Sequence, residues 1–160
     1  MSHFENRDGM SPIVRTVCGW VAGFILLYGI QVVLYGHLTP GGGFSGGVIA
    51  ASAFVLILLA EGENAATETF SRKAASTLDS LGVLLFWLMP ILGILVAGLF
   101  FVNFWITPPE SHLSLWSGGI IPVCNIGIGL KVCSSLYLVV LVLTAVAHDQ
   151  IDVHRKEEAT

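Results

Sequence analysis

Charged residues are scarce in this sequence. They make up 11% of its 160 residues, whereas a soluble domain usually carries about 25%. Hydrophobic residues account for 54%, and the charges avoid the long apolar stretches. This pattern is typical of a polytopic membrane protein, so we expect neither a separate soluble domain nor nucleic-acid binding. The net charge of −4 comes mainly from short loops and tails and points to no partner.

Several kinds of site lack the residues that they need. The three cysteines, Cys18, Cys124 and Cys133, lie in apolar contexts without metal-ligand spacing, so we expect buried free thiols and no metal site. No histidine pair has such spacing either. No Gly-Lys-Ser/Thr ending marks a phosphate loop, and no nucleophile-plus-base pattern is present. We therefore expect no cofactor and no catalytic site of the chain's own.

Four apolar stretches are long enough to cross the roughly 30 Å hydrocarbon layer as helices. We place them at about residues 13–35, 44–60, 81–102 and 120–147, within a single membrane domain over residues 1–160. The predicted fold is all-α, a polytopic integral membrane protein with about four transmembrane helices. Because the first stretch is as long as a spanning helix, we expect a retained anchor rather than a cleaved signal peptide.

The basic residues predict the orientation. With four spans, both termini and the loop at 61–80 share one side of the membrane. That side holds six of the seven lysines and arginines: Arg7, Arg15, Arg72, Lys73, Arg155 and Lys156. The opposite connections, around residue 37 and at 103–119, hold none. By the positive-inside rule, both termini and the 61–80 loop are cytoplasmic.

The 61–80 loop is predicted to form a short cytoplasmic helix. Glu68 stands four residues before Arg72. This spacing brings opposite charges together on one helix face. We therefore expect an ion pair between the two side chains.

The most unusual segment is residues 36–47, Gly-His-Leu-Thr-Pro-Gly-Gly-Gly-Phe-Ser-Gly-Gly. Glycine costs about 1 kcal/mol and proline about 3 kcal/mol relative to alanine inside a helix. The composition therefore predicts a non-helical path or close backbone packing. Histidine is the residue type most often used to relay protons at neutral pH, so His37 is a candidate proton relay, with hydrogen bonding to the turn as the alternative.

Small residues also recur at helical spacing. Gly43, Gly47 and Ala51 form a ladder on the second span, and Gly19 and Gly23 form a pair on the first. Such patterns let helix backbones approach closely. They predict helix packing, either within this chain or against another.

Lys131 is the main candidate for chemistry, because no other charged residue lies between Gly118 and His148. If the fourth helix uses the last 20 residues of its apolar run, Lys131 reaches the outer interface. If the helix begins near Ile120, the lysine lies deep in the membrane, at a cost of at least about 2.5–3.5 kcal/mol. We find no acidic residue at comparable depth, so we expect any partner on another subunit. The lysine then serves either ion conduction or structural pairing.

Residues 117–130 precede this lysine and contain several glycines, Pro122 and Asn125. They predict an irregular or broken start of the fourth span, because irregular backbone at membrane depth needs burial or water. One interpretation is a discontinuous helix beside a hydrated path. The other is a loop that dips into a subunit interface.

Two motifs carry a family resemblance. The pattern Gly-His-x-x-Pro-Gly-Gly-Gly-Phe-x-Gly-Gly at 36–47 and Asn-Ile-Gly-Ile-Gly-Leu-Lys-Val at 125–132 make the chain similar to the B subunit of Mrp/Mnh-type multisubunit cation/proton antiporters. The resemblance covers about residues 12–147. It makes His37 and Lys131 the candidates for an ion path. The motif positions expected to serve packing are Pro40, Gly41, Gly42, Gly43, Phe44, Gly46, Gly47, Asn125, Gly127 and Gly129.

The resemblance implies a small accessory subunit without its own catalytic site, in a prokaryotic cell membrane. Its assembly would exchange Na⁺ or other monovalent cations for protons, with the main proton channel in larger subunits related to those of complex I. The subunit would pack its neighbours and line part of an ion path. Homologous subunits also occur in energy-converting membrane hydrogenases and sulfur-reducing relatives, so a redox-driven host is one alternative. A purely structural scaffold is another, and a stand-alone channel or enzyme a third.

Overall fold

The computed structural model describes residues 10–105 and 116–158. In this part of the chain there are five helices and no strands: α1 (Pro12–Leu34), α2 (Gly42–Glu61), α3 (Glu63–Thr69), α4 (Arg72–Ala97) and α5 (Ile121–Glu158). Four of them, all except α3, are long and apolar enough to cross a membrane. The predicted all-α class with about four membrane-spanning helices is therefore confirmed.

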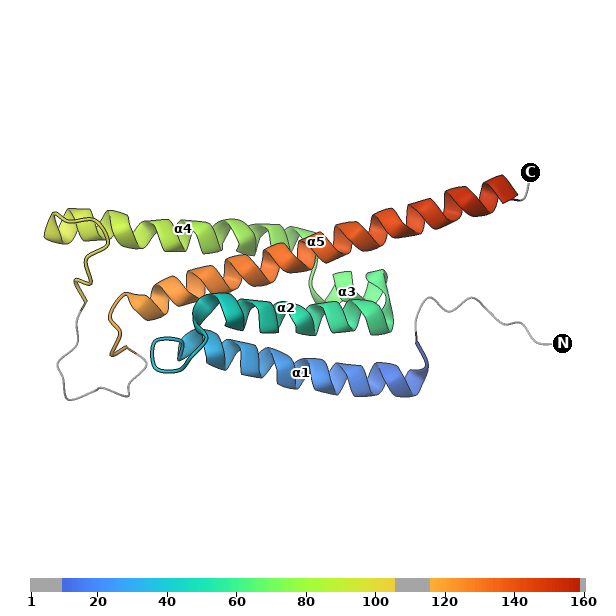
Figure 1. The fold of residues 1–160 in the computed structure, drawn as a ribbon, viewed down its shortest axis with the longest axis horizontal. Coiled ribbons are helices and arrows are strands. Elements are labelled where there is room, and N and C mark those ends of the chain that lie inside the picture. Colours follow the sequence, from blue (N-terminus) through green and yellow to red (C-terminus); the bar gives the residue numbers. More distant parts are fainter. Residues whose placement is uncertain (1–9, 106–115, 159–160) are drawn as a thin grey trace.

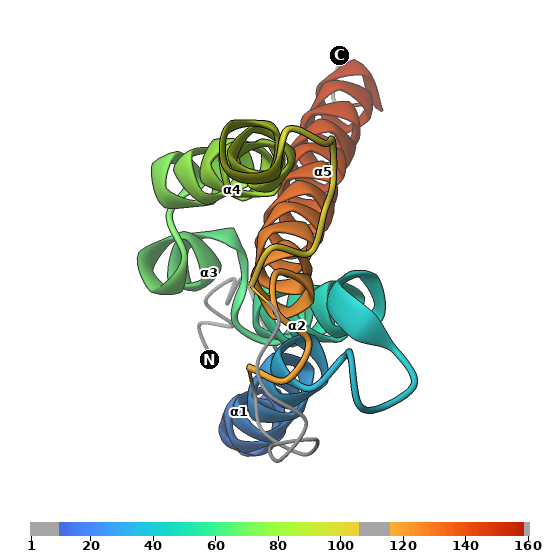
Figure 2. The same ribbon diagram turned by 90° about the vertical axis from the view of Figure 1, so that its left-hand side faces the viewer.

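The four long helices lie side by side in the order α1, α2, α5, α4 (Figures 1 and 2). The short α3 packs beside the end of α2. We call this end of the bundle the α3 end, and the opposite end, where α1 turns into α2, the glycine-turn end. Helices α1 and α4 run toward the glycine-turn end, whereas α2 and α5 run away from it (Figure 1).

Backbone chemistry sets the limits of the helices. Pro12 occupies the first turn of α1. Backbone N–H groups in the first turn have no helical acceptor, so a proline there costs no hydrogen bond. The Ser71 hydroxyl accepts a hydrogen bond from the Ala74 N–H at 3.2 Å and caps α4. The same helix ends at Gly98, whose φ of 69° is a left-handed conformation that favours glycine.

The turn between α1 and α2 depends on glycine. Gly41 has φ 141° and Gly42 has φ 78°, values that residues with a Cβ rarely adopt. A Cβ on Gly36 would also overlap the backbone of Gly42. The chain therefore reverses here through backbone conformations that other residues would strain.

The 61–80 loop contains the predicted short helix, but the ion pair expected within it is wrong. Helix α3 stops at Thr69 and Phe70 is extended, with φ −140° and ψ 95°, so Glu68 and Arg72 do not share a helix. Arg72 instead pairs with Glu63, with a nitrogen–oxygen distance of 2.6 Å. Helix α4 begins at Arg72, earlier than the span expected from residue 81.

The fourth span starts more regularly than expected. Helix α5 is continuous from Ile121, and the irregular backbone is confined to turns at residues 116–120. Asn103 stabilises these turns: its amide donates to the Gly118 carbonyl at 3.1 Å and its oxygen accepts from the Ile120 N–H at 3.1 Å. Both the discontinuous helix and the dipping loop are therefore wrong for residues 121–130, because a proline in the first turn does not interrupt a helix.

A buried apolar cluster lies at the α3 end. Tyr137 and Leu141 of α5 are 0% exposed and contact a buried cluster with Leu58, Ala66 and Ala75. Around this cluster the rings of Phe54, Phe70 and Tyr137 pack together, with centroids 4.6–5.7 Å apart. This apolar contact holds α3 against the long helices.

Candidate functional site

Lys131 lies against α4 in an ion pair. Its ammonium nitrogen is 2.6 Å from one oxygen of Asp79 and 2.7 Å from the other. The Ser135 hydroxyl, one helical turn further along α5, donates to the same carboxylate. Two charges of opposite sign and a hydroxyl therefore converge between α4 and α5.

The register of the helices places Lys131 well inside the bundle. Gly47 of α2 contacts Gly129 of α5, and the two helices run in the same direction, so Lys131 lies level with Ile49. At 1.5 Å per residue, Ile49 is about 10 Å from the start of α2 and about 18 Å from its end. Because α5 begins at Ile121, Lys131 lies ten residues into this helix, and its side chain is directed to a carboxylate.

The expectation that any partner of Lys131 would belong to another subunit is wrong. Asp79 belongs to the same chain, and it was missed because residues 61–80 were assigned to a loop. The signal was available: Ser71 is a good N-cap residue, so a helix can begin at Arg72. Asp79 then stands seven residues inside α4, about 10 Å along its axis.

The two sequence motifs meet at the contact between α2 and α5. The Gly43 N–H donates to the side-chain oxygen of Asn125 at 3.4 Å. A Cβ on Gly43 would overlap the Asn125 backbone, and a Cβ on Gly47 would lie 2.8 Å from the Gly129 carbonyl oxygen. The motif residues therefore let two helix backbones touch.

Two further glycines of the motifs contact other helices. A Cβ on Gly46 would lie 2.8 Å from the Gly29 carbonyl oxygen of α1, and one on Gly127 would lie 3.0 Å from the Gly82 carbonyl oxygen of α4. Pro40 and Phe44, by contrast, are exposed on this chain. Close backbone approach thus extends through three helix contacts, whereas these two side chains point outward.

His37 lies at the glycine-turn end, apart from Lys131. Its Nε2 is 3.3 Å from the Ser117 hydroxyl, and a Cβ on Gly118 would lie 3.0 Å from its ring. Lys131 stands ten residues into α5, about 15 Å from the start of the helix. The structure therefore places the two ion-path candidates at different levels.

Among the residues that the structure describes, no group of three or more histidine, cysteine, aspartate or glutamate side chains could hold a metal ion. The arrangement around Lys131 is a charge pair with a hydroxyl. Such a group can hold or exchange a proton, or contact a passing cation, through its oxygens and its ammonium nitrogen.

Comparison with known proteins identifies the family. Residues 13–138 match the model of a domain related to the MnhB subunit of Na⁺/H⁺ antiporters. The chain belongs to this family. The matched range contains both motifs, and it also contains Asp79, Lys131 and Ser135.

Two curated proteins illustrate the similarity of this MnhB-family chain to known sequences. An uncharacterised protein of Methanocaldococcus jannaschii is 35% identical over 130 residues, which are 79% of this chain and 49% of that protein. A Staphylococcus aureus protein named "Putative antiporter subunit mnhB2" is 48% identical over 48 residues, 30% of this chain and 34% of that one. The chain therefore spans about half the length of the first and a third of the second.

A solved structure shares the fold of this MnhB-family chain. It belongs to the membrane-bound sulfane sulfur reductase, described as an archaeal respiratory membrane complex. The match has a TM-score of 0.62 and 28% identity, and it covers 83% of this chain and 60% of that chain. The fold of this chain thus also occurs in a chain of a membrane complex.

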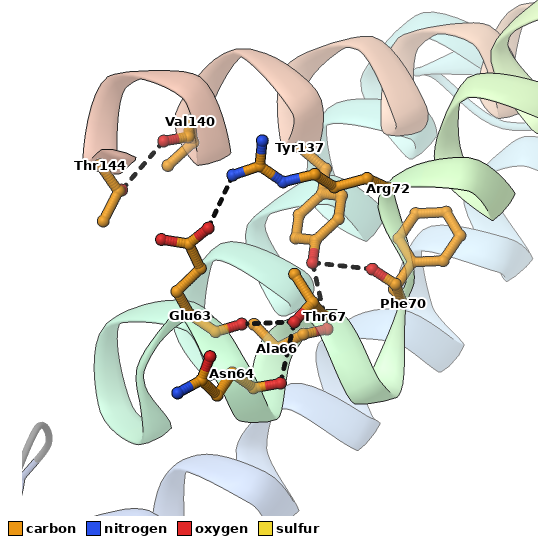
Figure 3. A network of polar contacts seen from close by, with 9 residues as sticks. All are labelled: Glu63, Asn64, Ala66, Thr67, Phe70, Arg72, Tyr137, Val140 and Thr144. Atoms are coloured by element: carbon orange, nitrogen blue, oxygen red, sulfur yellow. Dashed lines mark hydrogen bonds and ion pairs between the residues drawn. The ribbon is translucent and has the colours of Figure 1, made fainter. Parts of the chain in front are cut away.

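A second polar network, at the α3 end, fixes the segment that leads into α4 (Figure 3). The buried Tyr137 hydroxyl lies 3.1 Å from the Ala66 carbonyl oxygen and 2.9 Å from that of Phe70, and its single proton serves both. The Arg72–Glu63 pair lies beside it, with side chains 49% and 36% exposed. These contacts anchor the beginning of α4, the helix that carries Asp79.

Proposed function

We propose that this chain is a small integral membrane subunit of a multisubunit monovalent cation (Na⁺)/proton antiporter module. It packs neighbouring subunits and lines part of an ion path. The MnhB family match supports the class of assembly, and the ion pair of Lys131 with Asp79 supports contact with the path. The chain acts as an accessory subunit in one membrane domain, and the large subunits perform the main transport step.

The observation that carries the proposal is an ion pair inside apolar spans. Charged side chains at membrane depth are costly, and they are usually functional and face protein or water. Lys131 and Asp79 keep 41% and 25% of their side chains exposed on this chain, so lipid alone is a poor neighbour for them. A hydrated path or another subunit would solvate the pair.

The distribution of basic residues supports an orientation with both termini in the cytoplasm. In that orientation α3 is on the cytoplasmic side and the glycine turn is on the outer side. The host membrane would be the cell membrane of a prokaryote. Cysteine accessibility labelling in whole cells, at an exposed position of α3 and at one of the glycine turn, tests this topology. Labelling of α3 from outside would contradict it.

Replacing Lys131 with alanine tests the proposed function. We expect the complex to assemble and Na⁺-driven proton movement in inverted vesicles to fall strongly. His37→Ala is the parallel variant at the glycine-turn end. Full transport in both variants, combined with loss of assembly in a Gly43 variant, would instead identify a structural scaffold. Cation flux through the purified, reconstituted chain alone would identify a stand-alone channel.

A redox-driven ion-pumping complex is the second candidate host. The observation that favours it is the fold match to a chain of the sulfane sulfur reductase complex. Mass spectrometry of the proteins that co-purify after gentle detergent extraction separates the two hosts. Complex-I-related subunits alone would support the antiporter, whereas additional iron–sulfur or nickel–iron proteins would support redox-driven pumping.

A further inference from the structure

We propose that Asp79 is the positioning residue for Lys131. It fixes the lysine ammonium group in the interior of the membrane, on the face of α4 and α5 that is open to a neighbouring subunit or to water. This inference rests on the proposed function, because it assigns a role in the ion path. Asp79 lies outside both sequence motifs.

Helices α4 and α5 approach each other closely beside the pair. A Cβ on Gly82 would lie 2.7 Å from the Gly127 carbonyl oxygen and 2.8 Å from the Lys131 backbone nitrogen. Gly82 follows Asp79 by three residues, so both lie on the same face of α4. The glycine contact thus brings a short aspartate side chain within reach of the lysine.

The lysine side chain points in an unusual direction. Side chains of an α-helix tilt toward its N-terminus, which for α5 is the glycine-turn end. The carboxylate instead holds the ammonium group beside Ser135, one turn further from that end. Asp79 therefore determines the level at which the positive charge lies.

The lysine ammonium group remains accessible from the surface of the chain. A lysine ammonium has three N–H donors, and its nitrogen contacts both oxygens of Asp79 at 2.6 and 2.7 Å. The lysine side chain is 41% exposed on the chain surface. The remaining donor can thus meet a water molecule or an oxygen of another subunit, while Asp79 keeps the charge in place.

Stability alone does not explain the pair. Replacing an ion pair in a low-dielectric environment with well-packed apolar residues is often neutral or stabilising. A scaffold would therefore not require charges at this depth. A charge that must be held at one level for transport does require its partner.

The experiment uses the intact complex in inverted membrane vesicles and compares Asp79→Asn, Asp79→Glu and Ser135→Ala. We expect Na⁺/H⁺ exchange to fall roughly tenfold or more in Asp79→Asn, since the lysine charge loses its partner. Asp79→Glu, which restores the carboxylate, should recover most of the activity. Ser135→Ala should have a smaller effect. Glu68→Gln, which neutralises an exposed carboxyl on α3, is the matched control and should retain full exchange.

The amount of assembled complex is measured in the same membranes for Asp79→Asn, Lys131→Gln and the double variant. If the two residues act as a pair, the double variant assembles better than the sum of the single losses predicts. If the complex with Asp79→Asn fails to assemble, the Asp79→Glu complex tests the proposal instead. The proposal then requires that the Asp79→Glu complex assembles and exchanges Na⁺ for H⁺. Wild-type exchange in Asp79→Asn, or no exchange in an assembled Asp79→Glu complex, would overturn the proposal.

Exchange and assembly together distinguish a failure of the proposed function from a failure of the positioning role of Asp79. No exchange by the wild-type complex would contradict the proposed function, and the assembly comparison would still test the pairing. Normal exchange in Lys131→Gln together with strong coupling in assembly would leave the family function intact. That outcome would reduce the pair to a structural contact, and the positioning role would be rejected.

Discussion

Helix α5 contacts α2 and α4 in two different ways. On the side of α2, it meets Gly43 and Gly47 through backbone atoms and one amide hydrogen bond. On the side of α4, it meets Gly82 in the same close manner but adds the ion pair of Lys131 and Asp79. The first contact joins helices without charged groups, whereas the second uses close approach to bring charges together. Loss of the first should therefore affect assembly, and loss of the second should affect transport.

The strongest test of the α2–α5 contact is Gly47→Val. Its side chain would meet the Gly129 carbonyl oxygen and Val132, both within 3 Å of a Cβ. Overpacking of this kind costs about 1–3 kcal/mol, and sometimes more. We expect a large loss of assembled complex, measured by native gel electrophoresis of solubilised membranes.

The matched control is Gly19→Val, because a Cβ on Gly19 has no neighbour within 4 Å in this chain. It should fold normally within the chain. Equal losses in Gly19→Val and Gly47→Val would show that the outward face of α1 is as tightly packed in the complex as the α2–α5 contact.

The next largest effect is expected for Gly82→Val at the α4–α5 contact. The added side chain would push α4 from the Gly127 carbonyl oxygen and the Lys131 backbone. Asp79 would then lose its short contacts. We expect exchange activity to fall further than the amount of assembled complex, measured in the same vesicles. If Gly82→Val loses assembly but keeps full activity per complex, the α4–α5 contact serves assembly rather than transport, contrary to our expectation.

A moderate effect is expected for Tyr137→Phe, which keeps the ring and removes the hydroxyl between α3 and α5. The Ala66 and Phe70 carbonyl oxygens would lose their donor. A hydrogen bond of this kind contributes about 1 kcal/mol. The thermal transition of the purified complex should fall slightly, and exchange should persist. An unchanged transition would mean that water replaces the hydroxyl.

The smallest effect is expected for Arg72→Gln. The Arg72–Glu63 pair is substantially exposed, and exposed ion pairs contribute about 0.2–1 kcal/mol. We expect a change in the thermal transition smaller than that of Tyr137→Phe, and no change in exchange. A loss of exchange as large as that of Asp79→Asn would show that the α3 end also belongs to the ion path.

The sequence predicted the spans because hydrophobic length is a local property. It also identified the glycine ladder at Gly43 and Gly47, whose period is visible without a structure. It could not select the partner of that ladder, because many helices can accept a row of glycines. The structure places Asn125 and Gly129 against this ladder. The two motifs of the resemblance therefore form the two sides of one helix contact.

Asp79 was missed for a different reason. Polar residues at 76, 77, 79 and 80 lowered the apolar signal at the start of α4, so the span was expected from residue 81. Hydropathy averages over neighbouring residues, so it does not find the start of a helix whose first turns are polar. The pairing with Lys131 then depends on the antiparallel register of α4 and α5, which no local pattern specifies.

The parallel contact between α2 and α5 has a consequence for how the chain is made. Gly43 and Asn125 are 82 residues apart. At a synthesis rate of about 5–20 residues per second, the glycine face of α2 waits roughly 4–16 s for its partner. During that interval α1 and α2 can pair as a hairpin. The face of α2 that later contacts α5 then faces lipid or the insertion machinery. A ribosomal pause between α2 and α5 would therefore extend the period in which another glycine-rich helix can occupy that face.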